Sequence, residues 1–281
     1  MKFVKMQACG NDFVVVDARD MQRDWSKLAI AICQRHFGVG ADGLLLAVPS
    51  TVADLGMRIF NPDGSEAEAC GNGLRCVAKY AWENLAAGNQ ELRIETLAGI
   101  SRVRPYMTAG RVDRVQVSMG MPQFKAEDIP VAMGQILDIT PILDYPLSVG
   151  GRELSLTFVS LGNPHAVCFW PEPVTGFPLA EVGPEVGRHP IFPQGVNFEV
   201  ANVIDRGHLE ARVWERGVGE TLACGTGACA IAVAARLHGY CHNQVDIKLP
   251  GGTLTVDWDG EGEVLLTGPV ELAFDGEWPE E

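Results

Sequence analysis

The sequence has little positive charge. Lys and Arg together number 22 against 36 Asp and Glu, which gives a formal net charge of −14 and a pI near 4.8. The basic residues are scattered along the chain, whereas proteins that bind nucleic acid or anionic membranes gather them on one surface. We therefore expect neither nucleic acid nor a membrane among the partners of this protein.

Long hydrophobic runs are also missing. No apolar stretch approaches the roughly 20 residues that a transmembrane helix needs. The N-terminus, Met1–Met6, carries no apolar segment typical of a secretory signal, so we expect a cytoplasmic protein. The eight cysteines include no Cys-x-x-Cys motif, and in a chain of this length without a signal peptide they are expected to be reduced thiols.

A short cysteine motif occurs twice. Ala69–Gly73 reads Ala-Cys-Gly-Asn-Gly and Ala223–Gly227 reads Ala-Cys-Gly-Thr-Gly, and their cysteines lie 224 − 70 = 154 positions apart. A Gly-Asn pair recurs at nearly the same offset, because Asn11 and Asn163 are separated by 163 − 11 = 152 positions. A chain of 281 residues is long enough for two domains of ordinary size. The repeat therefore predicts two related halves.

Short runs of the kind that form β-strands occupy much of the chain. A helix is expected directly behind each cysteine motif, at about Gly73–Leu85 and Gly227–His238, because both stretches are rich in alanine. A third helix is predicted at Trp25–His36, with Asp24 as its N-cap. Many strands and one central helix in each half predict an α+β fold made by duplication.

A cysteine at the first turn of a helix has distinctive chemistry. Unpaired backbone N–H groups and the positive end of the helix dipole both stabilise a thiolate, and a glycine-lined helix start also binds carboxylates. Two such helix starts would hold one carboxylate from two sides, with a thiol on either face of the adjacent carbon. A single buried cysteine is more often a small core residue. The duplication is what favours proton removal by one thiolate and proton delivery by the opposite thiol.

Longer motifs surround both cysteines. They are Gly10–Phe13 (Gly-Asn-Asp-Phe), Asn61–Cys76 with its Asn-Pro-Asp-Gly start, Gly162–His165 (Gly-Asn-Pro-His) and Glu215–Thr221 (Glu-Arg-Gly-Val-Gly-Glu-Thr). Together they closely resemble the signature of the diaminopimelate epimerase family, in the family's order along the whole chain. The resemblance implies an isomerase that interconverts LL- and meso-2,6-diaminopimelate in lysine and peptidoglycan precursor biosynthesis, without pyridoxal phosphate or any other cofactor.

The resemblance also implies an architecture. It predicts an α+β fold of two pseudo-symmetric domains from an internal duplication, each a mostly antiparallel, barrel-like sheet around a central helix. The substrate would bind in the cleft between them. The C-terminal tail of family members returns to the first domain, so we expect residues 1–120 plus 269–281 to form one domain and residues 121–268 the other. A homodimer is implied as well.

Individual roles follow from the motifs that the family shares with this chain. Cys70 is expected to accept the α-proton in the LL-to-meso direction, and Cys224 to donate one. His165 and Glu215 resemble the pair that tunes the pKa values of the two thiols. Substrate contacts are expected from Asn11, Asn61, Gly71, Asn72, Asn163, Asn197, Glu215, Arg216, Gly225 and Thr226. No metal site is expected.

Two positions depart from the family pattern. Gly43 stands where one branch of the family carries a glutamine that reaches the ligand, and Cys9 precedes Gly10 where an apolar residue is expected. Neither departure touches the two motif cysteines.

Other interpretations stay open at this level. The asparagines beside Gly or Pro are typical of turns, and a histidine behind a proline is often structural. Within the same superfamily, a proline or hydroxyproline racemase, or an isomerase of the phenazine-pathway type, is the nearest rival. The proline racemases carry Cys-Gly-His in the first motif, where this chain has Cys70-Gly71-Asn72. A different class, a thiol redox protein, would use Cys70 and Cys224 as a switchable disulfide.

Overall fold

The computed structural model describes residues 1–68, 70–85, 90–132 and 140–279. The fold is mixed α/β and built mostly from strands. The chain divides into two compact units: unit 1 is Met1–Ser118 with Thr267–Glu281, and unit 2 is Met119–Leu266. Among the described residues, no helix combines the length and the apolar character that crossing a membrane requires.

Unit 1 contains a sheet in which most neighbouring strands are antiparallel. The β2–β3 and β4–β6 pairs are parallel. Short β5 pairs with β4, antiparallel. In order across the sheet the strands are β18 (Glu271–Glu277), β1 (Lys2–Ala8), β2 (Asn11–Asp17), β3 (Gly43–Val48), β4 (Leu55–Phe60), β6 (Leu92–Thr96), β7 (Gly99–Thr108) and β8 (Arg111–Ser118), with β5 (Glu66–Ala67) beside β4.

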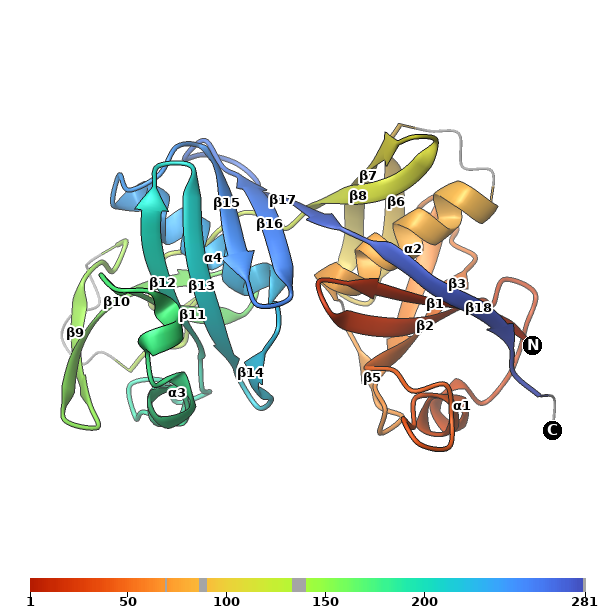
Figure 1. Ribbon diagram of the computed structural model, residues 1–281, viewed down its shortest axis with the longest axis horizontal. Coiled ribbons are helices and arrows are strands. Elements are labelled where there is room, and N and C mark those ends of the chain that lie inside the picture. Colours follow the sequence, from red (N-terminus) through yellow and green to blue (C-terminus); the bar gives the residue numbers. More distant parts are fainter. Residues whose placement is uncertain (69, 86–89, 133–139, 280–281) are drawn as a thin grey trace. The chain divides into compact units, whose positions relative to one another are not determined.

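Helix α2 (Gly71–Asn84) is the centre of unit 1. It packs against strands from both ends of the sheet, including β1 and β8 (Figure 1). Its buried apolar residues recur at helical spacing, which gives the helix one continuous core-facing stripe: Leu74, Val77, Ala78 and Ala81. The predicted helix therefore exists and begins two residues before Gly73.

Helix α1 (Trp25–Ile32) begins as the sequence predicts. The Asp24 carboxylate accepts a hydrogen bond from the Lys27 N–H at 3.0 Å and caps the helix. The helix ends four residues earlier than the predicted His36. Its core contacts come from Trp25, Ala29 and Ile32, the residues that face the β3 side of the unit.

Unit 2 has a sheet with the same sequence of pairings. The parallel pairs are β11–β12 and β13–β15, and β14 is the short antiparallel partner of β13. In order the strands are β9 (Tyr145–Val149), β10 (Arg152–Ser160), β11 (Pro164–Phe169), β12 (Asn197–Asp205), β13 (His208–Glu215), β15 (Gln244–Leu249) and β16 (Gly252–Asp257), with β14 (Gly219–Thr221) beside β13.

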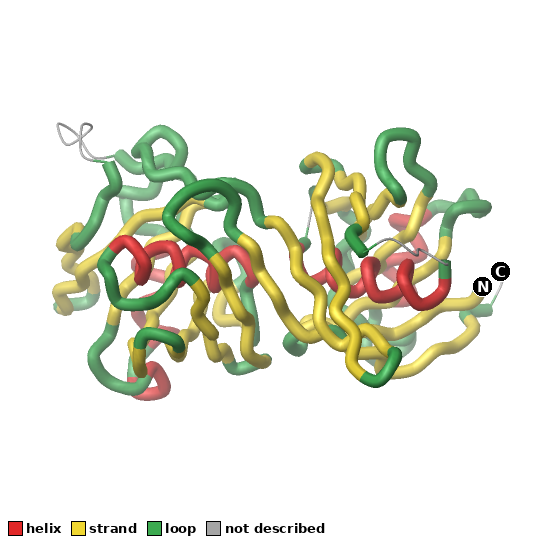
Figure 2. The backbone as a smooth tube through the Cα atoms, turned by 90° about the horizontal axis from the view of Figure 1, so that it is seen from above, coloured by secondary structure: helices red, strands yellow, loops and turns green. Residues whose placement is uncertain are grey.

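Helix α4 (Gly225–Leu237) occupies the middle of unit 2, as α2 does in unit 1, with strands around it (Figure 2). Every side chain from Ala228 to Ala235 is buried, because small residues let strands approach the helix from several directions. Helix α3 (Leu179–Gly187), which follows the 3-10 turn η1 (Val174–Gly176), was not predicted. Pro184 lies inside it, and an interior proline is a signal against a helix.

The C-terminal segment leaves unit 2 and joins the sheet of unit 1. After β17 (Leu265–Pro269) the Val270 N–H donates to the Asp113 carbonyl at 3.0 Å, and β18 then pairs antiparallel with β1. An edge-to-face contact between Phe3 and Phe274, with ring centroids 6.2 Å apart, fixes the two strands together. The last strand of the chain thus completes the sheet that the first strand begins.

Candidate functional site

Cys70 is the N-cap of helix α2. Its backbone is extended (φ −150°, ψ 117°), and its Sγ accepts a hydrogen bond from the Gly73 N–H at 3.4 Å. This is the position where Ser or Asp usually caps a helix, so the sulfur takes the place of a capping oxygen. The side chain is half-buried. A thiolate at this position would receive the same stabilisation as any anion at a helix start.

A chain of polar contacts leads from the Cys70 sulfur through Asn11 and Asn72 to Arg75. The Asn11 Oδ1 lies 3.9 Å from the Cys70 Sγ and accepts a hydrogen bond from the Asn72 Nδ2 at 3.1 Å. The Asn72 Oδ1 accepts in turn from the Arg75 Nη2 at 2.8 Å. We call Asn11, Cys70, Asn72 and Arg75 the Cys70 cluster.

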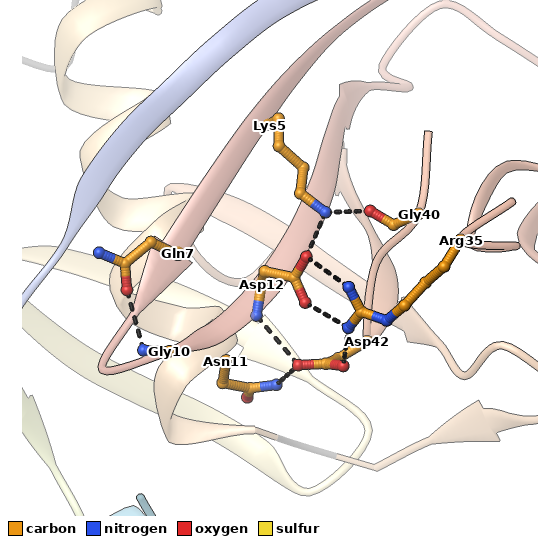
Figure 3. A network of polar contacts seen from close by, with 8 residues as sticks. All are labelled: Lys5, Gln7, Gly10, Asn11, Asp12, Arg35, Gly40 and Asp42. Atoms are coloured by element: carbon orange, nitrogen blue, oxygen red, sulfur yellow. Dashed lines mark hydrogen bonds and ion pairs between the residues drawn. The ribbon is translucent and has the colours of Figure 1, made fainter. Parts of the chain in front are cut away.

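An ion-pair network holds the other end of the Asn11 side chain (Figure 3). The Asn11 Nδ2 donates to the Asp42 Oδ2 at 2.9 Å, and Arg35 bridges Asp42 and Asp12 at 2.6 and 2.9 Å. Lys5 also pairs with Asp12. Because Asp42 can only accept, the amide of Asn11 is fixed with its carbonyl oxygen toward the Cys70 sulfur.

Asp12 is strongly acidic in this network. Partial burial alone would raise the pKa of Asp12, but hydrogen bonds from Arg35 and Lys5 outweigh burial and lower it to about 2. The carboxylate therefore stays ionised at any physiological pH and keeps both cations in place.

Arg75 is a fully buried guanidinium. Besides Asn72 it donates to the Pro269 carbonyl at 3.3 Å and lies 3.8 Å from the Cys9 Sγ, while its Nη1 has no hydrogen-bond partner among the described residues. The hydrogen-bond partners that it has there are all uncharged. Cys9, which adopts a left-handed backbone (φ 54°), is thus linked to the Cys70 cluster through Arg75. Burial raises the pKa of the Cys9 thiol, and the charge of Arg75 opposes that rise.

Cys224 is the N-cap of helix α4 with nearly the same geometry. Its Sγ accepts from the Gly227 N–H at 3.4 Å and lies 3.4 Å from the Thr226 Oγ1. Burial raises the pKa of the Cys224 thiol well above its ordinary value, and the negative charges of Glu215 and Glu199 raise it further. The hydrogen bonds from Thr226 and Gly227 act in the opposite direction. This sulfur is therefore held as a thiol.

A buried histidine–glutamate pair lies behind Cys224. The His165 Nδ1 is 2.6 Å from the Glu199 Oε1, and neither side chain is exposed to solvent. The His165 Nε2 is 2.9 Å from the Asn163 Oδ1, and the Asn163 Nδ2 donates to the Thr226 Oγ1 at 3.3 Å. We call Asn163, His165, Glu199, Cys224 and Thr226 the Cys224 cluster.

The remaining predicted residues of unit 2 lie at the ends of its strands. Asn197 donates to the Pro164 carbonyl at 3.0 Å and accepts from the Arg216 N–H at 2.8 Å, so its amide ties two strands together. The Glu215 Oε1 accepts from the Thr221 hydroxyl at 2.6 Å. Arg216 is exposed, and its Nη1 reaches the Gln194 carbonyl at 3.1 Å.

In unit 1, Asn61 forms a turn. Its N–H donates to the Ser65 carbonyl at 2.8 Å and its Nδ2 to the Ser65 Oγ at 2.9 Å. Gly71 and Gly225 are the first residues of their helices, directly after the capping cysteines. The motif residue Ala69 lies outside the described residues.

The expected site residues include neither Arg75 nor Glu199, and Glu199 is the more informative omission. Glu199 is the hydrogen-bonded partner of His165, whereas Glu215 bonds Thr221. The signal was present in the sequence, because Glu199 is the only charged residue in the largely apolar run from Val196 to Val203. A glutamate in a strand that is otherwise buried needs a partner, and the parallel pairing of His165 with Asn197 brings that partner within reach.

A family model and the most similar relatives point to the same family. A family model described as "Diaminopimelate epimerase" matches residues 3–125 and 157–273. A diaminopimelate epimerase from Moorella thermoacetica is 49% identical over 282 residues and covers 99% of both chains. One from Acetivibrio thermocellus is 44% identical over 279 residues, covering 99% of this chain and 98% of its own.

Solved structures show that the fold is shared more widely. A phenazine biosynthesis protein of the PhzF family from Bacillus anthracis superposes with a TM-score of 0.72 at 18% identity, covering 100% of this chain and 99% of its own. A hydroxyproline epimerase from Agrobacterium vitis superposes with a TM-score of 0.68 at 18% identity, covering 98% and 90%. At these identities the likeness concerns the fold alone.

Proposed function

The chain belongs to the diaminopimelate epimerase family, and from that premise we propose that it inverts the α-carbon of diaminopimelate with Cys70 and Cys224 as its two acid–base groups. One observation carries the proposal: both cysteines cap a helix through their sulfur, at 3.4 Å from a backbone N–H. Cysteines that only fill the core would not be expected at the N-cap of both central helices.

The reaction needs one base and one acid on opposite faces of the α-carbon. In the LL-to-meso direction the Cys70 thiolate removes the α-proton, and the electron pair of the broken C–H bond moves into the adjacent carboxylate. The Cys224 thiol then delivers its proton to the opposite face. Cys70 ends as a thiol and Cys224 as a thiolate, which is the correct starting state for the reverse direction.

The planar intermediate carries extra negative charge on the carboxylate. Backbone N–H groups at the starts of α2 and α4, from Gly71 and Asn72 and from Gly225 and Thr226, would bind that charge. These donors are in place before the substrate arrives, so the charge can develop without reorganising the protein. No metal or other cofactor takes part in the proposed steps.

The other proposed contacts follow the family motifs. Asn11 and Asn163 would assist at the reacting end of the substrate, while Asn61 and Asn197 would bind along its length. Arg216 is exposed and carries the planar fork that pairs with a carboxylate, so it and Glu215 would bind the distal, non-reacting end. His165 and Glu215 would adjust the acidity of the thiols.

We further propose that the two units are duplicated, barrel-like domains, close to the boundaries expected at residues 1–120 with 269–281 and at 121–268. The equal order of strand pairing in both units supports the duplication. A cytoplasmic homodimer would be consistent with the family.

The test is incubation of the reduced protein with LL-diaminopimelate in D₂O without added cofactor. Epimerisation together with one deuterium at the inverted α-carbon is the expected result. The same assay with L-proline and trans-4-hydroxy-L-proline tests the rival racemase activity. Deuterium exchange with either of these but not with diaminopimelate would overturn the proposal. Absence of exchange with all of them, with both thiols titrated as reduced, would favour the thiol redox alternative.

A further inference from the structure

Equivalent positions in the two units carry different chemistry. Phe13 pairs with Gly43 between β2 and β3, as His165 pairs with Asn197 between β11 and β12. Two residues further along the second strand of each pair stand Leu45 and Glu199. Unit 1 therefore has Phe and Leu where unit 2 has His and Glu.

Leu45 and Glu199 also occupy the same place beneath their helices. A Cβ built on Gly73 would lie 3.1 Å from a methyl of Leu45 and 3.5 Å from the Cys70 Cβ. A Cβ built on Gly227 would lie 3.0 Å from the Glu199 Oε1 and 3.3 Å from the Cys224 Cβ. A carboxyl oxygen thus lies under the first turn of α4, beside its capping cysteine, where α2 has a hydrocarbon.

The hydrogen bonds around His165 fix the proton count. The amide of Asn163 gives its Nδ2 to Thr226, so its oxygen faces His165 and the imidazole Nε2 must carry a proton. One further proton is then shared between the His165 Nδ1 and the Glu199 Oε1, 2.6 Å apart. The Glu199 Oε2 has no hydrogen-bond partner among the described residues. The pair is neutral as a whole, with its acidic end nearest the helix start.

Burying an acid in this place lowers the stability of the fold, and unit 1 shows that the fold does not require it. Its effect concerns the stabilisation that the start of α4 can give to a thiolate. Negative charge on Glu199 under the first turn of α4 interacts with the same N–H groups and helix dipole that would otherwise stabilise a thiolate. The titratable groups that face Cys224 within unit 2 are Glu199 from β12, with His165 from β11 behind it, and Glu215 from β13.

We infer that Glu199, held by His165, is a positioning residue that keeps Cys224 protonated before the reaction, and that Leu45 places a hydrocarbon at the equivalent position beneath Cys70, the proposed base. The inference rests on the proposed two-thiol function. It assigns the difference between two similar helix starts to one buried pair of residues.

The chain itself offers the matched variant. Replacing His165 with Phe and Glu199 with Leu gives unit 2 the packing that unit 1 already has, so no buried charge is left unpaired. Glu199→Gln, which keeps the shape and can still bond the imidazole, is the second variant. Both are first compared with the parent protein by circular dichroism and thermal unfolding.

The decisive measurement uses no substrate. Methyl methanethiosulfonate, a small thiol reagent, is applied across a pH series, and peptide mass mapping gives the modification rate of each cysteine. In the parent protein Cys70 should react at lower pH than Cys224. In both variants the Cys224 midpoint should fall by about one pH unit or more, which is tenfold or more in thiolate at a given pH, while the Cys70 midpoint stays unchanged.

An unchanged Cys224 midpoint in a folded variant would overturn the inference. A shift in Glu215→Gln but not in Glu199→Gln would overturn it too, because Glu215 alone would then set the state of the thiol. Failure of the proposed function has a different signature, since the deuterium assay would show no exchange at diaminopimelate whatever the midpoints are.

Discussion

The Cys70 and Cys224 clusters have a similar backbone arrangement but different ionisable groups. Both cysteines cap a central helix with Sγ 3.4 Å from the N–H three residues on. In each unit an asparagine at the start of the first strand of the parallel pair, or directly before it, bonds the side chain of the second helix residue: Asn11 with Asn72, and Asn163 with Thr226. Around Cys70 the one buried charge of the cluster is the Arg75 guanidinium. Around Cys224 the buried ionisable groups are His165 and Glu199, a pair that is neutral as a whole and has its acidic end nearest the helix start.

The amides of Asn11 and Asn163 are oriented in opposite ways. Asp42 can only accept a hydrogen bond, so Asn11 presents its oxygen to the helix start. The His165 Nε2 can donate, so Asn163 presents its NH₂ group instead. A duplicated backbone can therefore carry two opposite polar surfaces, because an amide is reversed by whichever partner holds its far end.

Removing either sulfur should have the largest effect on catalysis. Cys70→Ala and Cys224→Ala should each lower kcat/KM for epimerisation by about 10³-fold or more, since each removes a general acid–base group. Steady-state assays in both directions measure the loss. Cys229→Ala, a buried cysteine one turn further along α4, is the control and should keep activity. Substantial activity in either site variant would contradict the two-thiol mechanism.

The reverse exchange tests why unit 1 has hydrocarbon under its helix. Leu45→Glu alone should destabilise the protein by on the order of 3–5 kcal/mol, because it buries an acid without a partner. Adding Phe13→His should recover part of that loss by supplying the partner that His165 gives Glu199. Urea unfolding compares the variants. Equal stability of the single variant and the parent would show that the Leu45 site admits water.

Arg75 is the corresponding feature of the Cys70 cluster. Arg75→Met removes the donors to Asn72 and Pro269 and should lower kcat/KM by about 10- to 100-fold, the effect of misplacing a group at the reacting centre. Lys79→Met removes the other buried cation of α2, whose partner is Glu83, and should affect stability rather than activity. A loss of activity of the same size in both variants would assign Arg75 to packing alone.

The smallest effect concerns acid stability. The pKa of Asp12 is lowered to about 2 in the folded protein, so its ion pairs stabilise the fold fully above its ordinary pKa near 3.8 and are lost as pH falls toward 2. Asp12→Asn should remove that part of the acid dependence, worth at most about 1 kcal/mol after solvent screening. Unfolding midpoints measured between pH 5 and pH 2 check it. An identical pH dependence in the variant would contradict the assignment.

Much of this molecule is predictable from residue patterns. The repeated cysteine motif predicts two equivalent helix starts, and the structure confirms both, with each helix beginning two residues earlier than expected because the cysteine itself is the cap. Asp24 caps α1 as predicted. Motif order predicts the family, which the full-length relatives confirm.

Other features escape residue patterns. Helix α3 was missed because it contains Pro184, and an interior proline is a signal against a helix. The role of Arg75 could not be read from its motif, because its burial depends on Cys9 and on the chain segment around Pro269, which are distant in sequence. The predicted grouping of substrate-binding residues across the two units stays a prediction.

Residue patterns suffice to predict the helix starts, the position of the capping sulfurs and the family, because these depend on local spacing and on motifs that are continuous in the chain. The ionisable groups that lie behind each sulfur depend instead on contacts between distant parts of the chain. Glu199 and His165 are 34 residues apart, and only the parallel pairing of β11 with β12 brings them into a buried hydrogen bond. The energy of a charge depends on what surrounds it in space, and that environment is assembled from distant parts of the chain.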